Sequence, residues 1–363
     1  MLPSIVNKFD SGSAYIPSSP MIGWGHKESL EQGDSHYWGV WWGKEPFSVF
    51  ENKIGRFMSE YGFQGFPDRR TVQAFTRKED RFLGSSVMKA HQKHPEGFDI
   101  IDQYMDSDFI RPKIFDLYNY TSQLLQAGGI KVAIEAHRRA KPYCMGTLFW
   151  QYNDCWPVIS WSARDYYGRW KALMYTVKDA YKTMLVSPLV EGEKLNVYVV
   201  SDSSAEVSAE LQMRLMDFSG KTIWEKVVHA QVPADVSQSF FSEDLANLPA
   251  FKKESSLLEV ALKSAGRTLA GNVLYFVAPK DLKLSKPRFK INVTQGNEAY
   301  TIEISAEKLL KNVSLGIDED GRFTCNYMDI LPGENRKVVF KTSSKINNFE
   351  KKLKITSLYD AMK

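Results

Sequence analysis

The uneven distribution of aromatic residues most constrains how this chain can fold. Eight of the nine tryptophans precede residue 171, and only Trp224 follows it. In the first half, apolar segments that end in polar residues are separated by long helical stretches, whereas the second half consists of short alternating segments. These patterns indicate an α/β region followed by antiparallel β-structure. A length of 363 residues allows two or three such domains.

The first half alternates predicted strands with predicted helices. Apolar residues recur at helical spacing over 114–125, and the pattern resumes over 130–139 after an expected interruption at Gly128-Gly129. Another helix is predicted over 171–183. Strand, helix and strand in that order suggest a parallel α/β unit, which we assign to residues 1–186. The predicted strands lie in the segments 15–20, 33–42, 57–66 and 143–154.

The second half reads as two all-β units. After Ser187-Pro188, apolar and polar residues alternate with a period of two, as in a meander of short antiparallel strands. A break near Pro279-Lys280 separates a unit over 187–279 from a second over 280–363. Asn297-Glu298 follows Gly296 between two such runs and is predicted to form a hairpin turn.

Charge, hydropathy and cysteine spacing exclude several classes of partner. The 47 Lys and Arg residues exceed the 43 Asp and Glu residues by only four, a field too weak to indicate a nucleic-acid partner. No segment approaches the ~20 apolar residues that span a membrane, so no membrane partner is expected. Three widely spaced cysteines lack the pattern of a zinc site. We therefore expect no metal and no cofactor.

Polar residues at the ends of two predicted strands are the candidates for chemistry. They lie in the segments 59–64 and 149–157, and Glu60 in the first is either a helix-capping carboxylate or a reactive group. Nearby Trp and Tyr side chains suit the apolar face and hydroxyl rim of a pyranose, although many would instead fill the core. These aromatic residues are Trp24, Tyr37, Trp38, Trp41, Trp42 and Trp150.

Retaining glycoside hydrolysis is the reaction that such a site would fit. It requires two carboxyl groups about 5 to 5.5 Å apart, one that attacks the anomeric carbon and one that protonates the departing oxygen. Glu60 fits the first role, for which its carboxylate must stay ionised. Its partner must hold a proton at the working pH.

Three segments closely resemble the β-mannosidases of glycoside hydrolase family 2. They are GDSHYWGVWWG at 33–43, RFMSEYGFQGFP at 56–67 and GTLFWQYNDCWPVISWSARDYYGRWKAL at 146–173. The resemblance covers residues 1 to about 186 densely, and 329–334 resembles a turn in the last β-domain of that family. It implies that residues 1–186 form the C-terminal half of a (β/α)8 TIM barrel, about strands 5 to 8. Two immunoglobulin-like β-sandwich domains, at 187–279 and 280–363, would follow.

The resemblance also implies a reaction and a site. Glu60 matches the nucleophile of a retaining, double-displacement hydrolase that removes terminal β-D-mannose from an oligosaccharide or a glycoprotein-derived glycan. Trp150 matches a tryptophan of the mannose subsite, and Trp24 matches an aromatic wall. Trp42 stands where the family more often has Tyr, and His36 is either a hydroxyl contact or a structural histidine. The further candidates for substrate contact are Trp38, Asn153 and Asp154, with Gln151 near the same rim.

One catalytic group of the family has no counterpart in this chain. The acid/base Glu lies in an Asn-Glu pair upstream of the matched segments, and we reject Asn297-Glu298 as its equivalent. We therefore expect a fragment that is inactive alone: a piece of a longer enzyme, the product of a truncated gene, or one half of a split protein that a complementary N-terminal half completes.

Two alternatives remain open at this stage. One is a related exo-β-glucosaminidase or other β-glycosidase, and the other is a non-catalytic glycan-binding remnant. The resemblance is compatible with a lysosomal, periplasmic or secreted enzyme, and the sequence does not decide between these compartments.

Overall fold

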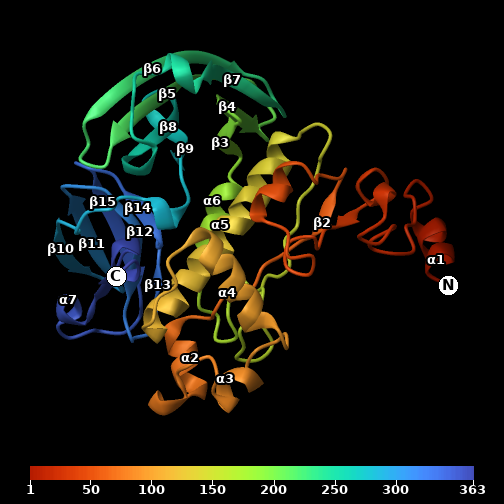
Figure 1. The fold of residues 1–363 in the computed structure, drawn as a ribbon. Coiled ribbons are helices and arrows are strands. Elements are labelled where there is room, and N and C mark those ends of the chain that lie inside the picture. The colour runs from red at the N-terminus through yellow and green to blue at the C-terminus, as the bar shows by residue number, and fades with distance from the viewer.

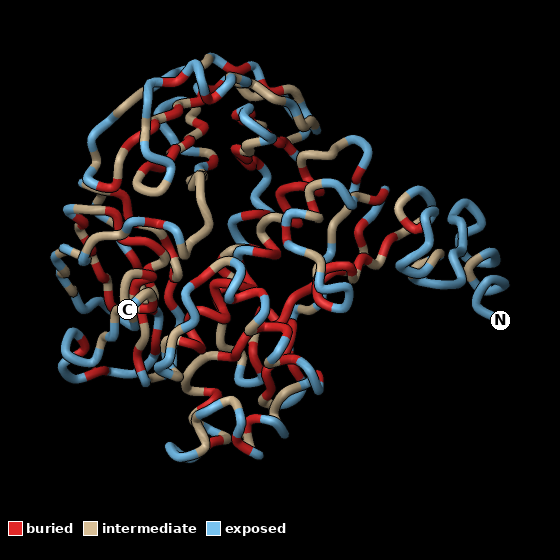
Figure 2. The backbone as a smooth tube through the Cα atoms, in the orientation of Figure 1, coloured by how far each residue is buried: buried red, intermediate tan, exposed pale blue.

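The computed structural model describes all residues from 1 to 363 and contains three regions, each with a hydrophobic core (Figure 1). An α/β region occupies the first half of the chain, and two antiparallel β-sandwiches follow it. Figure 2 shows that buried segments line the interior of each region, whereas the first residues are exposed and project from the body. No helix combines the length and the apolar composition that crossing a membrane requires.

The α/β region is built around two short parallel strands and a long helix. Strand β1 pairs in parallel with β2, and Met58 of β2 forms a parallel bridge to Thr147 on its other side. Three of the four predicted strand segments thus contribute to parallel pairing. The elements are α1 (Leu2–Phe9), β1 (Ser35–His36), β2 (Met58–Glu60), α2 (Arg69–Phe75), α3 (Ser86–Ala90), α4 (Gly97–Asp108), α5 (Phe115–Arg139) and α6 (Ala172–Ala180).

The strand predicted over 15–20 is absent from the structure. These residues adopt no regular secondary structure. Instead, the Ser19 hydroxyl donates a hydrogen bond of 2.6 Å to the Asp34 carboxylate. The segment is therefore attached to the α/β region by a side chain rather than by a backbone ladder, and apolar residues such as Ile16 stay exposed.

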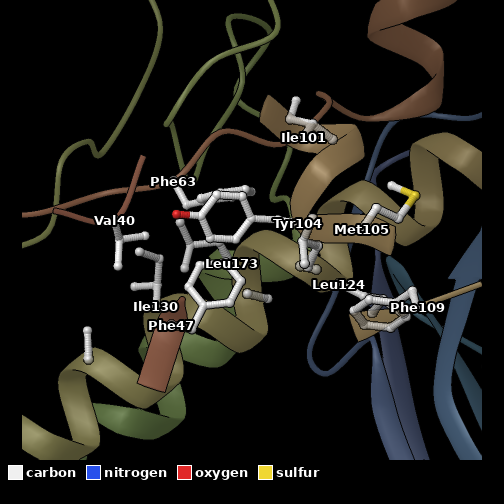
Figure 3. Packing of buried hydrophobic residues seen from close by; sticks show 14 of the residues in the cluster. Val40, Phe47, Phe63, Ile101, Tyr104, Met105, Phe109, Leu124, Ile130 and Leu173 are labelled. Carbon is white, nitrogen blue, oxygen red and sulfur yellow. The ribbon is translucent and has the colours of Figure 1, made fainter. Parts of the chain in front are cut away.

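Helix α5 runs unbroken through Gly128-Gly129, so the predicted interruption is wrong. Gly129 is buried, and a Cβ there would overlap the ring of Phe47, which begins the 3₁₀ turn Phe47–Glu51. Figure 3 shows Phe47 packed beside Ile130, with Phe63 and Tyr104 close by. The glycine thus serves close packing against the helix rather than a break in it.

The first sandwich has two antiparallel sheets, ordered β3-β4-β7 and β6-β5-β8-β9. The inward residues of β4, such as Val197 and Val199, are fully buried, as the alternating pattern predicts. The boundary assigned between 186 and 187 falls inside β3, because this strand already begins at Met184. The strands are β3 (Met184–Glu191), β4 (Lys194–Ser201), β5 (Val207–Asp217), β6 (Thr222–Val232), β7 (Ser237–Asp244), β8 (Ser256–Ser264) and β9 (Arg267–Tyr275).

The second sandwich pairs a sheet ordered β10-β11-β15-β13 with one ordered β14-β12-β16. Asn297-Glu298 forms the two-residue turn between β10 and β11, as predicted, and Glu298 has a positive φ of 51°. The elements are β10 (Phe289–Gly296), β11 (Ala299–Ala306), β12 (Leu310–Gly316), β13 (Arg322–Phe323), β14 (Met328–Ile330), β15 (Asn335–Lys341), α7 (Phe349–Lys352), β16 (Lys354–Thr356) and α8 (Leu358–Ala361).

Helix α5 connects the three regions. Near its C-terminal end, Arg138 forms an ion pair of 2.7 Å with Asp202 of the first sandwich. Nearer its N-terminal end, the Tyr120 hydroxyl donates to the carbonyl oxygen of Asn312 in the second sandwich at 2.6 Å. The α/β region is therefore held against both sandwiches by side chains of one helix.

Candidate functional site

Glu60 stands at the end of strand β2, directly beside the end of β1. It pairs with His36 in the parallel register, and the Tyr37 amide donates 2.8 Å to the Glu60 carbonyl oxygen. Because parallel strands end at the same edge of a sheet, the side chains of these two strand ends meet. The structure thus brings together Glu60, His36 and Trp38, three of the predicted site residues.

One oxygen of the Glu60 carboxylate is held by two neighbours. The Trp38 indole donates from Nε1 to Oε2 at 3.0 Å, and His36 Nδ1 lies 3.1 Å from the same oxygen. The other oxygen, Oε1, accepts no hydrogen bond from the protein. The side chain is 21% exposed, so it is oriented by the protein yet accessible. This arrangement leaves one carboxylate oxygen free to react.

A second carboxylate, Asp34, lies on the far side of His36 and was not singled out from the sequence. Its Oδ2 accepts from the hydroxyls of Ser19 and Ser59, each at 2.6 Å, and lies 4.0 Å from His36 Nε2. Partial burial raises the pKa of Asp34, but hydrogen bonds from Ser19, Ser59 and the Met21 amide outweigh it and hold that pKa below its usual value. Asp34 is therefore a fixed negative charge behind His36. The sequence did contain a signal for this role of Asp34. The residue directly precedes a strand that ends beside Glu60.

Trp150 is brought to the same edge by the chain that runs along β2. The Leu148 amide donates to the Met58 carbonyl at 2.8 Å, and the Trp150 amide donates to the Tyr61 carbonyl at 2.7 Å. A Cβ at Gly62 would overlap the Trp150 carbonyl oxygen, so the glycine of the Ser-Glu-Tyr-Gly segment permits this approach. The Trp150 side chain is 43% exposed and so is available as an aromatic surface.

Asp154, which is predicted as a substrate contact, has a buried carboxylate. It is only 5% exposed, and its carboxylate accepts hydrogen bonds from Ser160 at 2.7 and 2.9 Å and from the Ser162 hydroxyl. Behind it, the fully buried Lys171 ammonium donates to the carbonyls of Gly65 at 2.8 Å and Ser160 at 3.2 Å. Asp154 therefore orders the loop that follows Trp150. Its burial favours support of that loop over direct contact with a substrate.

The structure does not join the remaining predicted residues to Glu60. Trp42 is 51% exposed, and its ring packs on His94 at a centroid distance of 4.6 Å. Trp24 lies exposed in the projecting N-terminal segment and makes no hydrogen bond or ring contact with the other site residues. Asn153 is exposed, and its side chain bonds only the adjacent Asp154 carbonyl, at 3.4 Å.

No group of three or more His, Cys, Asp or Glu side chains in the structure is arranged to hold a metal ion. The charged groups around Glu60 are instead joined in a chain from Glu60 through His36 and Ser19 to Asp34. Such a chain fixes the orientation of the imidazole between two carboxylates. The site can therefore present an oriented, partly exposed carboxylate beside aromatic surfaces.

Two domain families match the second half of the chain. The Mannosidase Ig/CBM-like domain matches residues 193–281, and the Ig-fold domain of mannosidases matches residues 284–361. Both sandwiches therefore belong to immunoglobulin-like families.

Similar proteins cover nearly the whole chain. It is 27% identical to a β-mannosidase B of Aspergillus fumigatus over 94% of this chain and 43% of that protein. A β-mannosidase B of Aspergillus clavatus is 28% identical over the same shares. The chain thus spans less than half the length of these relatives.

Solved structures agree with these relatives. The β-D-mannosidase of Dictyoglomus thermophilum superposes with a TM-score of 0.89 at 30% identity, over 98% of this chain and 44% of that one. The exo-chitosanase CsxA of Amycolatopsis orientalis superposes at 0.65 with 14% identity, over 86% of this chain and 44% of that one. The second match shows a shared fold alone.

Proposed function

From the confirmed resemblance to the β-mannosidases of glycoside hydrolase family 2, we propose that this chain is the nucleophile-bearing part of a retaining β-mannosidase. The observation that carries the proposal is the Glu60 carboxylate, fixed through one oxygen by Trp38 and His36 with the other oxygen free. A nucleophilic carboxylate needs this combination of orientation and access. The substrate would be a terminal β-D-mannosyl unit of an oligosaccharide or a glycoprotein-derived glycan.

The proposed reaction has two displacements. In the first, a Glu60 oxygen bonds to the anomeric carbon while the bond from that carbon to the aglycone oxygen breaks, and the aglycone oxygen takes a proton from an acid. In the second, water attacks the same carbon, the glycosyl bond to Glu60 breaks, and the water proton passes to the conjugate base. Glu60 supplies only the nucleophile. The departing aglycone oxygen still needs a proton, so the reaction requires a second carboxyl group that is protonated.

Asp34 is poorly suited to be that second group. The hydrogen bonds from Ser19 and Ser59 hold its pKa below its usual value, so it does not hold a proton near neutral pH. It also lies behind His36 rather than across an open space from Glu60. We infer that the acid/base residue belongs to a complementary N-terminal half. General acid catalysis is typically worth ~10²–10⁴-fold, so the chain alone should be nearly inactive on poor leaving groups.

The place where that half would dock is an exposed apolar edge. We infer that β1, β2 and the segment around Thr147 are part of a TIM barrel, of which this chain forms the C-terminal half. The backbone of 145–150 bonds β2 on one side, and Met145, Leu148 and Trp150 along it are exposed. An unpaired edge of a parallel sheet leaves backbone hydrogen-bonding groups and apolar side chains exposed. A further strand that paired with this edge would cover both.

Covalent trapping tests the proposal. The chain is incubated with 2-deoxy-2-fluoro-β-mannosyl fluoride, whose good leaving group needs little acid assistance, and its intact mass is followed over time. We expect one added glycosyl group on the unmutated chain and none on Glu60→Gln. Glu298→Gln, in the exposed β10–β11 turn, is the matched control and should be labelled normally.

The same experiment separates the alternatives. Labelling by the glucosamine-configured reagent in place of the mannosyl one would favour an exo-β-glucosaminidase. If the unmutated chain stays unlabelled even when co-expressed with the N-terminal half of a related β-mannosidase, the nucleophile assignment is wrong and a binding role takes its place.

A further inference from the structure

A cavity of about 490 Å³ lies between the α/β region and the second sandwich. One wall comes from the starts of α2 and α5 and from the loop over 167–170, and the other from β12, β13 and β16. In Figure 1 the second sandwich lies against the half of α5 that carries these residues. None of Glu60, His36, Trp38 and Trp150 lines the cavity. It is therefore separate from the candidate catalytic site.

Aromatic side chains form the interior of this cavity. Tyr327 lies near the rings of Tyr120 and Tyr175, at centroid distances of 6.2 and 6.1 Å. Trp170 packs edge-on against Tyr175 at 5.2 Å, and Tyr167 beside it is half exposed. Flat rings of this kind bind the CH face of a sugar. The cavity volume is also in the range of small-ligand sites.

Two arginines at the cavity lack full partners. Arg322 is exposed, forms no ion pair with a carboxylate, and holds its guanidinium 4.8 Å from the centre of the Trp170 ring. Arg169 lies 4.9 Å from the Tyr167 ring, and its Nη1 donates to the Thr71 hydroxyl at 2.8 Å. The Nε of Arg169 is buried and has no acceptor. A buried donor without an acceptor is unfavourable, so the hydrogen bonding of Arg169 is incomplete, and its side chain is 21% exposed.

The other cationic side chains around the cavity are already paired. Arg69 and Lys354 both bond Asp318, and Arg70 bonds Asp68 and Asp320. Asp320 lies 3.9 Å from Arg169 Nη2, a weak contact from a carboxylate that is itself 91% exposed. Arg322 is thus the one cationic side chain lining the cavity that forms no ion pair, whereas Arg169 has the long contact to Asp320 and reaches Asp165 through the Thr71 hydroxyl. Each of these guanidinium groups is oriented by an aromatic ring.

We propose that this cavity binds an acidic saccharide, a pyranose unit that carries a carboxylate or a phosphate group. The acidic group bonds Arg169 and Arg322, whose planar guanidinium groups suit such oxygen pairs. The sugar ring lies against the exposed face of Tyr167. The proposal does not depend on catalysis at Glu60.

Titration calorimetry on the full chain tests the proposal. The ligands are D-glucuronate, glucose 6-phosphate, neutral glucose and inorganic phosphate. We expect D-glucuronate or glucose 6-phosphate to bind with a dissociation constant of about 1 mM or tighter. Neutral glucose should bind at least tenfold more weakly. Arg322→Ala should lower the affinity for the acidic sugar at least about tenfold, as for loss of one charge-assisted hydrogen bond. Arg267→Ala, an exposed and unpaired arginine on β9, is the control and should change nothing.

Three results would overturn the proposal. The first is that neither D-glucuronate nor glucose 6-phosphate binds. The second is that an acidic sugar binds the unmutated chain and Arg322→Ala with equal affinity. The third is inorganic phosphate that binds as tightly as glucose 6-phosphate, which would remove the role of the sugar ring. Arg322 is exposed, so its variant should fold, and equal melting temperatures of the two arginine variants verify this. Arg169→Lys, which keeps the charge but loses the planar pair of guanidinium donors, should also weaken binding.

Discussion

Lys171 is a buried lysine that should make the free energy of unfolding of the α/β region rise with pH above neutrality. Its ammonium group is fully buried beneath the loop that follows Trp150. Burial lowers the pKa of Lys171 to about 7 from an ordinary 10.5, although the charges of Asp154 and Asp165 oppose the shift. Below pH 7 both the folded and unfolded states hold the proton, and the folded state bears the full cost of a buried charge. Above pH 7 only the unfolded state keeps it, so the free energy of unfolding rises with pH until about 10.5.

The magnitude follows from the separation of the two pKa values. It sets a limit of about 5 kcal/mol across the whole window and roughly 2 to 3 kcal/mol between pH 6.5 and pH 9. Lys171→Met removes the titrating group, so its stability should lack this increase, even though the Gly65 and Ser160 carbonyls lose their donor at every pH. The difference in pH slope between the two proteins therefore isolates Lys171.

Urea unfolding followed by tryptophan fluorescence is the assay. Eight of the nine tryptophans lie in the α/β region, so the signal reports mainly on the region that contains Lys171. Lys89→Met, an exposed lysine of α3, is the control and should keep the unmutated slope. Equal slopes for the unmutated chain and Lys171→Met would refute the reasoning.

Two further changes test the site and the packing around it. Trp38→Phe removes the donor to Glu60 Oε2 and should slow formation of the glycosyl adduct about tenfold or more, the factor for one hydrogen bond to a charged group, whereas an unchanged trapping rate would contradict its positioning role. Gly62→Ala would place a methyl group against the Trp150 carbonyl and should lower the melting temperature. In contrast, a methyl group at Gly128, inside helix α5, would meet nothing within 4 Å. Gly128→Ala should therefore raise the free energy of unfolding by up to about 1 kcal/mol, and thermal denaturation measures both effects.

Features set by local pattern were predictable from the sequence. Alternation in 195–199 placed the inward side chains of β4 correctly, and the polar residues after Gly296 formed the expected turn. These outcomes need only short-range information.

Features that depend on distant contacts were not predictable. Gly129 looked like a helix break, since nothing local shows that Phe47 packs on that face of α5. Asp154 looked like a rim residue, but serines 6 and 8 positions later in the chain draw its carboxylate inward. Asp34 was overlooked because its importance arises only when Ser19 and Ser59 converge on it from different segments.

The central claim is that Glu60 is the nucleophile, and the identity of the labelled residue tests it most directly. After trapping with the fluoromannosyl reagent, the chain is digested and the modified peptide is sequenced by tandem mass spectrometry. We predict a single ester-linked sugar on Glu60. An adduct on Asp34, or on any residue outside the strand end that carries Glu60, would contradict the account.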